Sequence, residues 1–187
     1  MLSPDLTENQ FLDVVNTLLL EGCKSSKSPF HQGTLATVSN NIPQIRTVVL
    51  RRWNLVRRSL IFHTDKRSTK VKELQENNRC SLLFYSKQDK LQLRFNCVSH
   101  LHYDDRLKDF IFKQTTASQR RCYEQTQAPS SILNTPLSRT LEARENFVVC
   151  VCNFTSLDLL FLNYDEHIRV HYNWDKKSIC NTTRLAP

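Results

Sequence analysis

The chain has 187 residues, a length that suits a single domain with a hydrophobic core. Its formal charge of +8 indicates either a basic surface or an anionic ligand. Only two glycines occur, Gly22 and Gly33, so the chain cannot build the glycine-rich turn of a Rossmann dinucleotide site or of a P-loop. Side chains and strand backbone would therefore have to hold any nucleotide-like ligand.

The seven cysteines are odd in number and show no C-x-x-C pair. Cys150 and Cys152 would lie on one face of a strand, which is poor spacing for zinc ligands. We therefore expect reduced, partly buried thiols and no metal site. No apolar run is long enough to span a membrane, and residues 1–5 lack the basic region of a signal peptide. These features favour a cytoplasmic protein with no membrane partner.

The N-terminal half predicts one helix followed by a series of strands. Residues 4–22 form an amphipathic pattern, because Phe11, Val15 and Leu19 recur at helical spacing. Between residues 30 and 100, β-branched and apolar runs are bounded by turn residues, and the short links between them favour antiparallel pairing. The predicted strands are 34–38, 44–51, 59–64, 80–85 and 91–99, and a short helix is predicted over 68–77.

The strand predicted over 91–99 alternates clearly. Its apolar residues at odd positions would face the core, while Gln92, Arg94 and Asn96 would face solvent or a ligand.

The C-terminal half predicts one helix and three further strands. Residues 104–113 form the helix, with Asp104 and Asp105 as candidate N-caps. Residues 115–136 show no clear period, and a loop of that length is functional or contains an unrecognised helix. The three strands are predicted over 147–153, 157–163 and 168–174.

These elements predict one mainly β domain over residues 1–187, an antiparallel barrel or sandwich with a few peripheral helices. Its parts are an N-terminal helix (1–22), a strand-rich core (30–100), a helix with a long loop (104–136) and C-terminal strands (147–187).

The stretch from Arg46 to Lys70 has the character of a phosphate-binding site. It runs through a strand, a turn and a second strand, and ends in a cluster of hydroxyls and cations that opens a helix. Helix N-termini offer free N–H groups and a favourable dipole to anions. Serine and threonine hydroxyls and arginine side chains add donors for phosphate oxygens.

Several stretches together resemble the pyridoxamine 5'-phosphate oxidase-like, FMN-binding split-barrel family, and the oxidase-related FMN-binding subfamily more than the vitamin B6 enzyme itself. The likeness covers residues 30–100 and extends more loosely to the C-terminus. The matching stretches are Leu35–Val38, Arg46–Arg51, His63–Lys70, Cys80–Phe84, Gln92 and Arg184–Pro187.

The resemblance implies an antiparallel split β-barrel that forms a homodimer and binds FMN in two clefts between the chains. The residues that would contact the cofactor are Arg46, Thr47, Val48, Val49, His63, Thr64, Ser68, Thr69, Lys70 and Gln92. Arg46, Thr64 and Lys70 correspond to phosphate ligands, and residues 47–49 to the strand along the flavin ring. Arg51, Arg169 and His171 correspond to substrate-binding positions.

The implied activity is that of an FMN-dependent oxidoreductase acting on a small, phosphorylated or otherwise anionic substrate, with hydride transfer to the flavin. The sequence departs from the vitamin B6 enzyme at four places. Thr69 replaces a second basic residue and Asn173 replaces a flavin-contacting arginine. Phe110 and Gln114 replace substrate-phosphate ligands.

Two other functions are compatible with the sequence. One is a non-enzymatic barrel that binds flavin or a haem-type group. The other is a basic barrel that binds nucleic acid. A nucleic-acid partner is disfavoured, because only Trp53 and Tyr85 are convincing candidates for base stacking between the cations.

Overall fold

The computed structural model describes the chain except for residues 1–2, 135, 141 and 176–178. Its nine strands form one antiparallel sheet in the order β2-β1-β5-β6-β7-β4-β3, to which β8 is added beside β7 and β9 beside β8. The strands are β1 (Gln32–Ser39), β2 (Ile42–Val49), β3 (Arg52–Asn54), β4 (Ser59–Asp65), β5 (Arg79–Ser86), β6 (Leu91–His102), β7 (Phe147–Leu162), β8 (His167–Trp174) and β9 (Cys180–Leu185).

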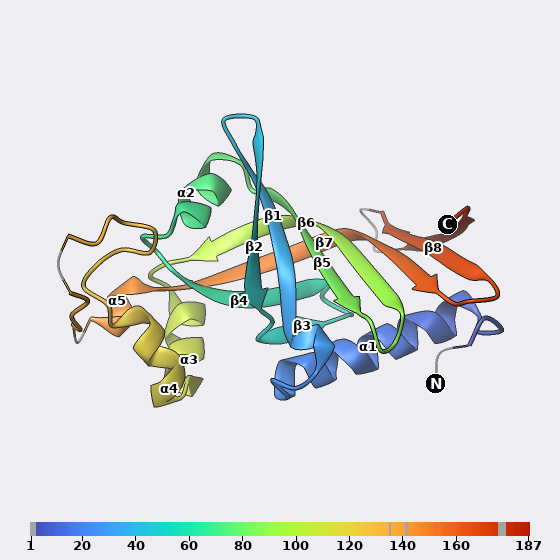
Figure 1. Ribbon diagram of the computed structural model, residues 1–187, viewed down its shortest axis with the longest axis horizontal. Coiled ribbons are helices and arrows are strands. Elements are labelled where there is room, and N and C mark those ends of the chain that lie inside the picture. Colours follow the sequence, from blue (N-terminus) through green and yellow to red (C-terminus); the bar gives the residue numbers. More distant parts are fainter. Residues whose placement is uncertain (1–2, 135, 141, 176–178) are drawn as a thin grey trace.

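The helices lie around the curled sheet. Helix α1 runs along one side of the barrel, and α3, α4 and α5 gather at one end (Figure 1). The helices are α1 (Glu8–Lys24), α2 (Thr69–Glu76), α3 (Arg106–Gln114), α4 (Ala117–Arg120) and α5 (Ala143–Asn146), with 3-10 turns at Pro29–His31 and Arg121–Tyr123. The predicted fold class, a mainly β antiparallel split barrel with peripheral helices, is confirmed. Within the described residues, no helix combines the length and the apolar character needed to cross a bilayer.

The core follows from the alternation of the strands. Apolar residues of β6 point inward, and Phe95 packs between Phe84 and Phe154 with ring centroids 6.2 and 5.2 Å away. Trp53 stacks on Phe154 at 5.3 Å, and its Nε1–H donates to Oδ1 of Asn16 in α1 at 2.8 Å. That bond satisfies the indole donor where α1 covers the barrel.

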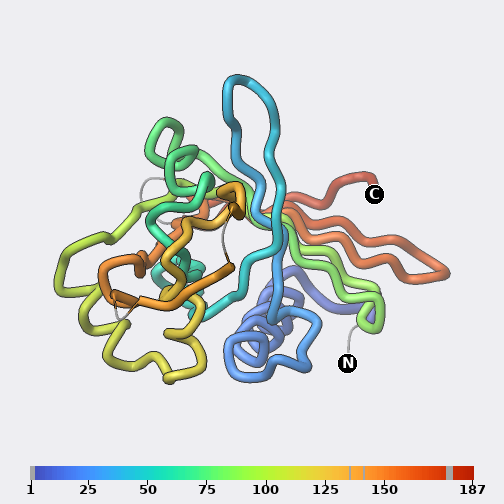
Figure 2. The backbone as a smooth tube through the Cα atoms, turned by 60° about the vertical axis from the view of Figure 1, so that its left-hand side comes forward, coloured from blue at the N-terminus to red at the C-terminus, as the bar shows by residue number. Residues whose placement is uncertain are grey.

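Both glycines lie at close approaches of two segments. A Cβ on Gly33 would lie 2.6 Å from the ring of Phe84, and a Cβ on Gly22 would lie 2.5 Å from the carbonyl oxygen of Phe30. The turn between β1 and β2 uses asparagines instead, since Asn40 and Asn41 have φ values of 50° and 63°. The resulting β1–β2 hairpin stands out from the body of the protein (Figures 1 and 2).

The helix boundaries shift by a few residues from the prediction. Helix α1 begins at Glu8 because Thr7 and Gln10 form a capping box. Asp105 caps α3 by accepting from the N–H of Lys108 at 2.9 Å, as expected for one of the two aspartates. The stretch after α3 contains α4 and a 3-10 turn, which the lack of a clear period concealed.

The strands predicted over 147–153 and 157–163 were wrong as separate elements, and β3 and β9 were not predicted. Residues 147–153 and 157–163 form one strand, β7, because the ladder to β6 continues through Phe154 and a register shift at Asn96/Cys97 absorbs the irregularity. Strand β9 was not predicted, since all of its residues are exposed and it adds to the sheet only through β8.

Candidate functional site

A cleft opens between β2 and β4, where the barrel is split. Strand β2 pairs only with β1 among the described strands, whereas β4 is paired on both sides by β3 and β7. The outer edge of β2 therefore presents unpaired backbone groups to the cleft. The cleft has a volume of about 290 Å³. It is lined by Thr47, Val48, Val49, Arg51, His63, Thr64, Asp65, Lys70, Cys122, Tyr123 and Pro129.

Hydroxyls and an ammonium group meet at one end of this cleft. Nζ of Lys70 donates to Oγ1 of Thr64 at 3.2 Å, and the Thr64 and Ser68 hydroxyls lie 3.2 Å apart. Ser68 is the N-cap residue of α2, so the free N–H groups of that helix open beside these side chains. Burial lowers the pKa of Lys70, with Arg46 as the next cause. These donors suit an anion such as a phosphate.

Arg46 lies on β2 but is not among the residues that line the cleft. Its guanidinium donates to Oε2 of Glu73 at 2.6 Å and to the Thr37 hydroxyl. Glu73 lies on α2 and is only 7% exposed. The predicted phosphate ligand is thus already neutralised by a carboxylate. No local pattern predicts this pairing, because Glu73 follows Arg46 by 27 residues.

His63 presents an unpaired polar atom at the cleft. Its Nε2 is buried and has no hydrogen-bond partner among the described residues. Its ring packs edge-on against Phe147 at 4.8 Å. Burial, followed by the charges of Arg51 and Arg52, lowers the pKa of His63 to about 3. The imidazole is therefore neutral at physiological pH, and its Nε2 can donate or accept one hydrogen bond to a ligand, depending on the tautomer.

A second, smaller pocket of about 150 Å³ adjoins the cleft. Arg51 and His63 line both spaces, and Arg52 and Gln114 belong to the smaller one. Arg52 also donates to the side-chain oxygen of Gln114 and lies 5.8 Å from the ring centroid of Phe110. The structure therefore brings Arg51, a predicted substrate ligand, together with Gln114 and with Arg52, a cation that was not predicted to belong to the site.

The remaining predicted residues lie elsewhere in the chain. Gln92 is paired through Leu160 of β7 with Arg169 of β8, and His171 follows on the same face. From Thr47 at the cleft, the ladder runs through Thr34 and Leu83 to Arg94, three strand spacings or about 14 Å across the sheet, and Gln92 lies two residues further along β6. A single chain does not bring Gln92, Arg169 and His171 to the cleft.

Arg169 has a partner on that face. It donates to both carboxylate oxygens of Asp158, at 3.1 and 2.9 Å, and Arg94 donates to the same group at 2.8 Å. Thr69, another predicted contact, is exposed at the start of α2 and does not line the cleft.

Arg67 fixes the segment that closes one side of the cleft. Its guanidinium binds the carboxylate of Asp65 and the carbonyl oxygens of Gln125 and Thr126 at 2.8 and 3.0 Å. These bonds secure the chain that carries Cys122, Tyr123 and Pro129 to the cleft. The segment of unclear period thus contributes to the site, which the sequence could not show because its anchor lies 58 residues away.

The sequence from residue 13 to residue 102 matches the family model described as pyridoxamine 5'-phosphate oxidase, FMN-binding domain. No curated protein matches the chain.

Solved structures share the fold of the whole chain. A pyridoxamine 5'-phosphate oxidase-related, FMN binding protein from Nostoc punctiforme PCC 73102 aligns with a TM-score of 0.78 at 20% identity, over 98% of this chain and 99% of that chain. PhzG from Burkholderia lata 383, in complex with tetrahydrophenazine-1-carboxylic acid, aligns with a TM-score of 0.76 at 18% identity, over 100% of this chain and 98% of that chain. At these identities the structural likeness establishes the fold alone.

Proposed function

We propose, from the resemblance of this chain to the FMN-binding domain family of pyridoxamine 5'-phosphate oxidase, that it binds FMN in the cleft between β2 and β4. We further propose that it acts as an FMN-dependent oxidoreductase and that two copies of the chain form the complete site. The observation that carries the proposal is the group of donors at the cleft, in which Lys70, Thr64 and the start of α2 converge beside the unpaired edge of β2.

The residues at the cleft fit the parts of FMN. A phosphate monoester carries up to two negative charges, which the Lys70 ammonium and the Thr64 hydroxyl can meet with charge-assisted hydrogen bonds. The flat ring system needs apolar contact and hydrogen-bonding groups along one edge. Val48 and Val49 provide the apolar contact, and the edge of β2 provides backbone groups. The orphaned Nε2 of His63 is a further group that a ligand would satisfy.

Bound FMN would supply the redox chemistry, and the chain would supply binding, orientation and charge. Arg51 and Arg52 line the adjoining pocket and are placed to hold an anionic group of a small substrate. His63 lies between the two spaces as a neutral imidazole, so it can orient a ligand without adding a third positive charge.

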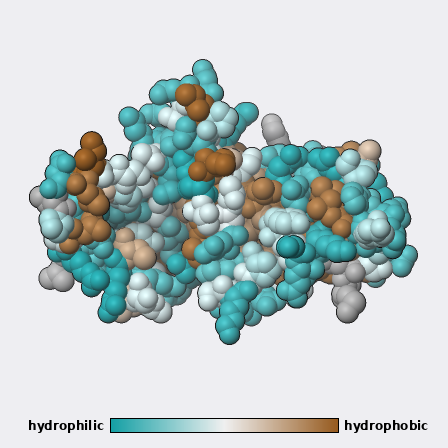
Figure 3. Space-filling model, in the orientation of Figure 1, coloured by the Kyte–Doolittle hydropathy of each residue, from teal (hydrophilic) through white to brown (hydrophobic). Residues whose placement is uncertain are grey.

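The proposed homodimer is supported by predicted site residues that do not line the cleft of their own chain. Gln92, Arg169 and His171 would reach the cleft of the partner chain. Their face of the sheet also carries exposed apolar residues, among them Ile45 (72% exposed) and Tyr85 (50% exposed). Apolar side chains also gather on the projecting β1–β2 hairpin (Figure 3). A partner chain on this face would remove apolar surface from water.

The test is a binding titration followed by the visible spectrum of the protein after desalting. We expect retained flavin bands with FMN and weaker binding of riboflavin, which has no phosphate. Retained FMN with no turnover, whether with oxygen or with a nicotinamide donor, would leave a flavin-binding protein without enzymatic activity. A protein that retains no FMN would contradict the proposal.

A further inference from the structure

Four of the seven cysteines form one cluster inside the barrel. Cys80, Cys97, Cys150 and Cys152 are each at most 7% exposed, although they come from three different strands. Sγ of Cys152 lies 3.9 Å from Sγ of Cys80 and 3.8 Å from Sγ of Cys150. All seven cysteines lie in the described part of the chain and are free thiols. Among the described residues, no three His, Cys, Asp or Glu side chains are arranged to hold a metal ion.

One pair in this cluster has the backbone placement of a disulfide. Cys80 of β5 and Cys97 of β6 are directly opposite each other in the antiparallel ladder. Opposite residues have Cα atoms about 4.5 or 5.5 Å apart, and both separations fall within the range that disulfides span. The other close pairs fit less well. Strand β6 separates Cys80 from Cys152, and Cys150 and Cys152 are about 6.6 Å apart along one strand, near the upper limit.

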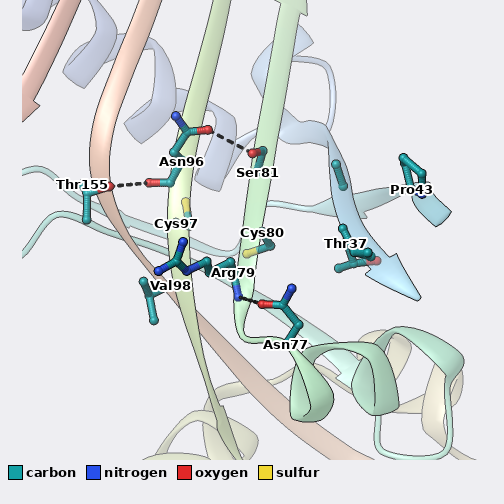
Figure 4. Close-up of a pocket in the computed structure, with 12 residues that line it drawn as sticks. Thr37, Pro43, Asn77, Arg79, Cys80, Ser81, Asn96, Cys97, Val98 and Thr155 are labelled. Atoms are coloured by element: carbon teal, nitrogen blue, oxygen red, sulfur yellow. Dashed lines mark hydrogen bonds between the residues drawn. The ribbon is translucent and has the colours of Figure 1, made fainter. Parts of the chain in front are cut away.

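The same pair is the part of the cluster that a small oxidant can reach. Cys80 and Cys97 both line a cavity of about 670 Å³. Its walls come from β1, β2, β5, β6 and β7 and from Asn77 at the end of α2. Figure 4 shows their sulfur atoms on neighbouring strands at the centre of this cavity. Cys150 and Cys152 do not line it and are fully buried. An oxidant in the cavity can therefore reach Cys80 and Cys97 but not the other two thiols.

The two thiols of the pair differ in acidity. Hydrogen bonds from the thiols of Cys152 and Cys97 lower the pKa of Cys80. The hydrogen bond to Cys80 and burial raise the pKa of Cys97. Cys80 is thus the thiol that ionises first, and the thiolate is the form that reacts with oxidants.

We propose that Cys80 and Cys97 are a redox-active pair that forms an intrachain disulfide when a peroxide enters the cavity. The Cys80 thiolate attacks one peroxide oxygen and becomes a sulfenic acid while, for hydrogen peroxide, the first water leaves. The Cys97 thiol then attacks the Cys80 sulfur, the S–S bond forms and the second water leaves. Two thiols are oxidised by two electrons in total, and one hydrogen peroxide is reduced to two waters.

The sequence allows the product to be identified directly. Trypsin separates the two cysteines into peptides 80–87 and 95–106, and it leaves Cys150 and Cys152 together in peptide 145–169. The folded protein is treated with hydrogen peroxide, its remaining thiols are alkylated after denaturation, and the unreduced digest is analysed by mass spectrometry. We expect peptide 80–87 linked to peptide 95–106, and a fall of two from the seven free thiols.

Other outcomes overturn the assignment. A link from peptide 80–87 to peptide 145–169 would mean that Cys150 or Cys152 is the partner, and unchanged thiols in the cluster would mean that the cavity does not admit the oxidant. The Cys97→Ser variant should leave Cys80 as a sulfenic acid that a dimedone probe traps. The matched control, Cys180→Ser, removes an exposed thiol outside both the cluster and the cleft and should form the disulfide as the unaltered chain does. The measurement on the unaltered protein tests the proposal even if Cys97→Ser does not fold.

Discussion

The cleft between β2 and β4 and the polar face of β6 to β8 hold two groups of predicted site residues, and the groups differ in how the chain assembles them. The first group comes from residues 47–70, and two neighbouring strands with one helix start bring it together. The second group, Gln92, Arg169 and His171, is aligned by strand register over a long sequence separation. The first group forms a concave site within one chain, whereas the second lies on an open sheet face. Under the proposed function, the first group binds the cofactor within one chain and the second would reach the cleft of a partner chain.

The largest effect is expected at Arg46, which directly precedes the first group in the sequence and is bound by Glu73. Arg46→Met should lower the free energy of unfolding by about 3 kcal/mol, because it leaves the buried carboxylate unpaired. Adding Glu73→Gln should restore most of that stability in a denaturant titration. We expect the double variant to bind FMN more weakly than the unaltered chain. Unchanged FMN affinity would show that Arg46 serves only the fold.

The next effect tests whether the cleft binds phosphate. Lys70→Met should weaken FMN binding about tenfold to a hundredfold, since a hydrogen bond to a charged group contributes about 1.5–3 kcal/mol. Riboflavin binding should change little, because that ligand has no phosphate. Lys72→Met is the matched control on an exposed position of the same helix. An equal loss for both ligands would contradict the phosphate assignment.

His63 should make the free energy of unfolding of the protein depend on pH. Its pKa is lowered from 6.5 to about 3 in the folded chain, so the unfolded chain binds the additional proton between these values. The stabilising contribution is fully present above pH 6.5 and is lost as the pH falls toward 3, with a slope of up to about 1.4 kcal/mol per pH unit. His63→Phe should flatten this part of the curve, whereas the exposed control His100→Gln should not. Equal slopes in all three proteins would contradict the assignment.

The smallest effect is expected on the open sheet face. Gln92→Leu should shift the spectrum or the potential of bound flavin and weaken binding by about 1 kcal/mol, the usual contribution of one hydrogen bond. Light scattering should give a dimer for the unaltered protein, because in the proposed site this residue would reach the cleft of a partner chain. A monomer that retains FMN would show that the two groups never meet.

Much of the fold could be predicted because the signals are local. Alternation in β6, the capping residues of α1 and α3 and the asparagine turn after β1 each depend on neighbours within a few residues. Strand β9 escaped prediction because it buries no residue and therefore has no apolar pattern. The continuity of β7 escaped because its pairing with β6, and not its composition, carries the strand through residues 154–156.

For the candidate site, the sequence alone determined which residue types follow one another: the strand of residues 47–49, the hydroxyls and cations of residues 63–70, and the polar face of residues 92–96. It also determined that no glycine-based nucleotide site could form. Only the tertiary structure decided that Glu73 neutralises Arg46, that Arg67 secures the segment at residues 125–126, and that four cysteines share one interior space. These contacts join residues far apart in the chain, and strand order and barrel closure place them, which no local pattern encodes.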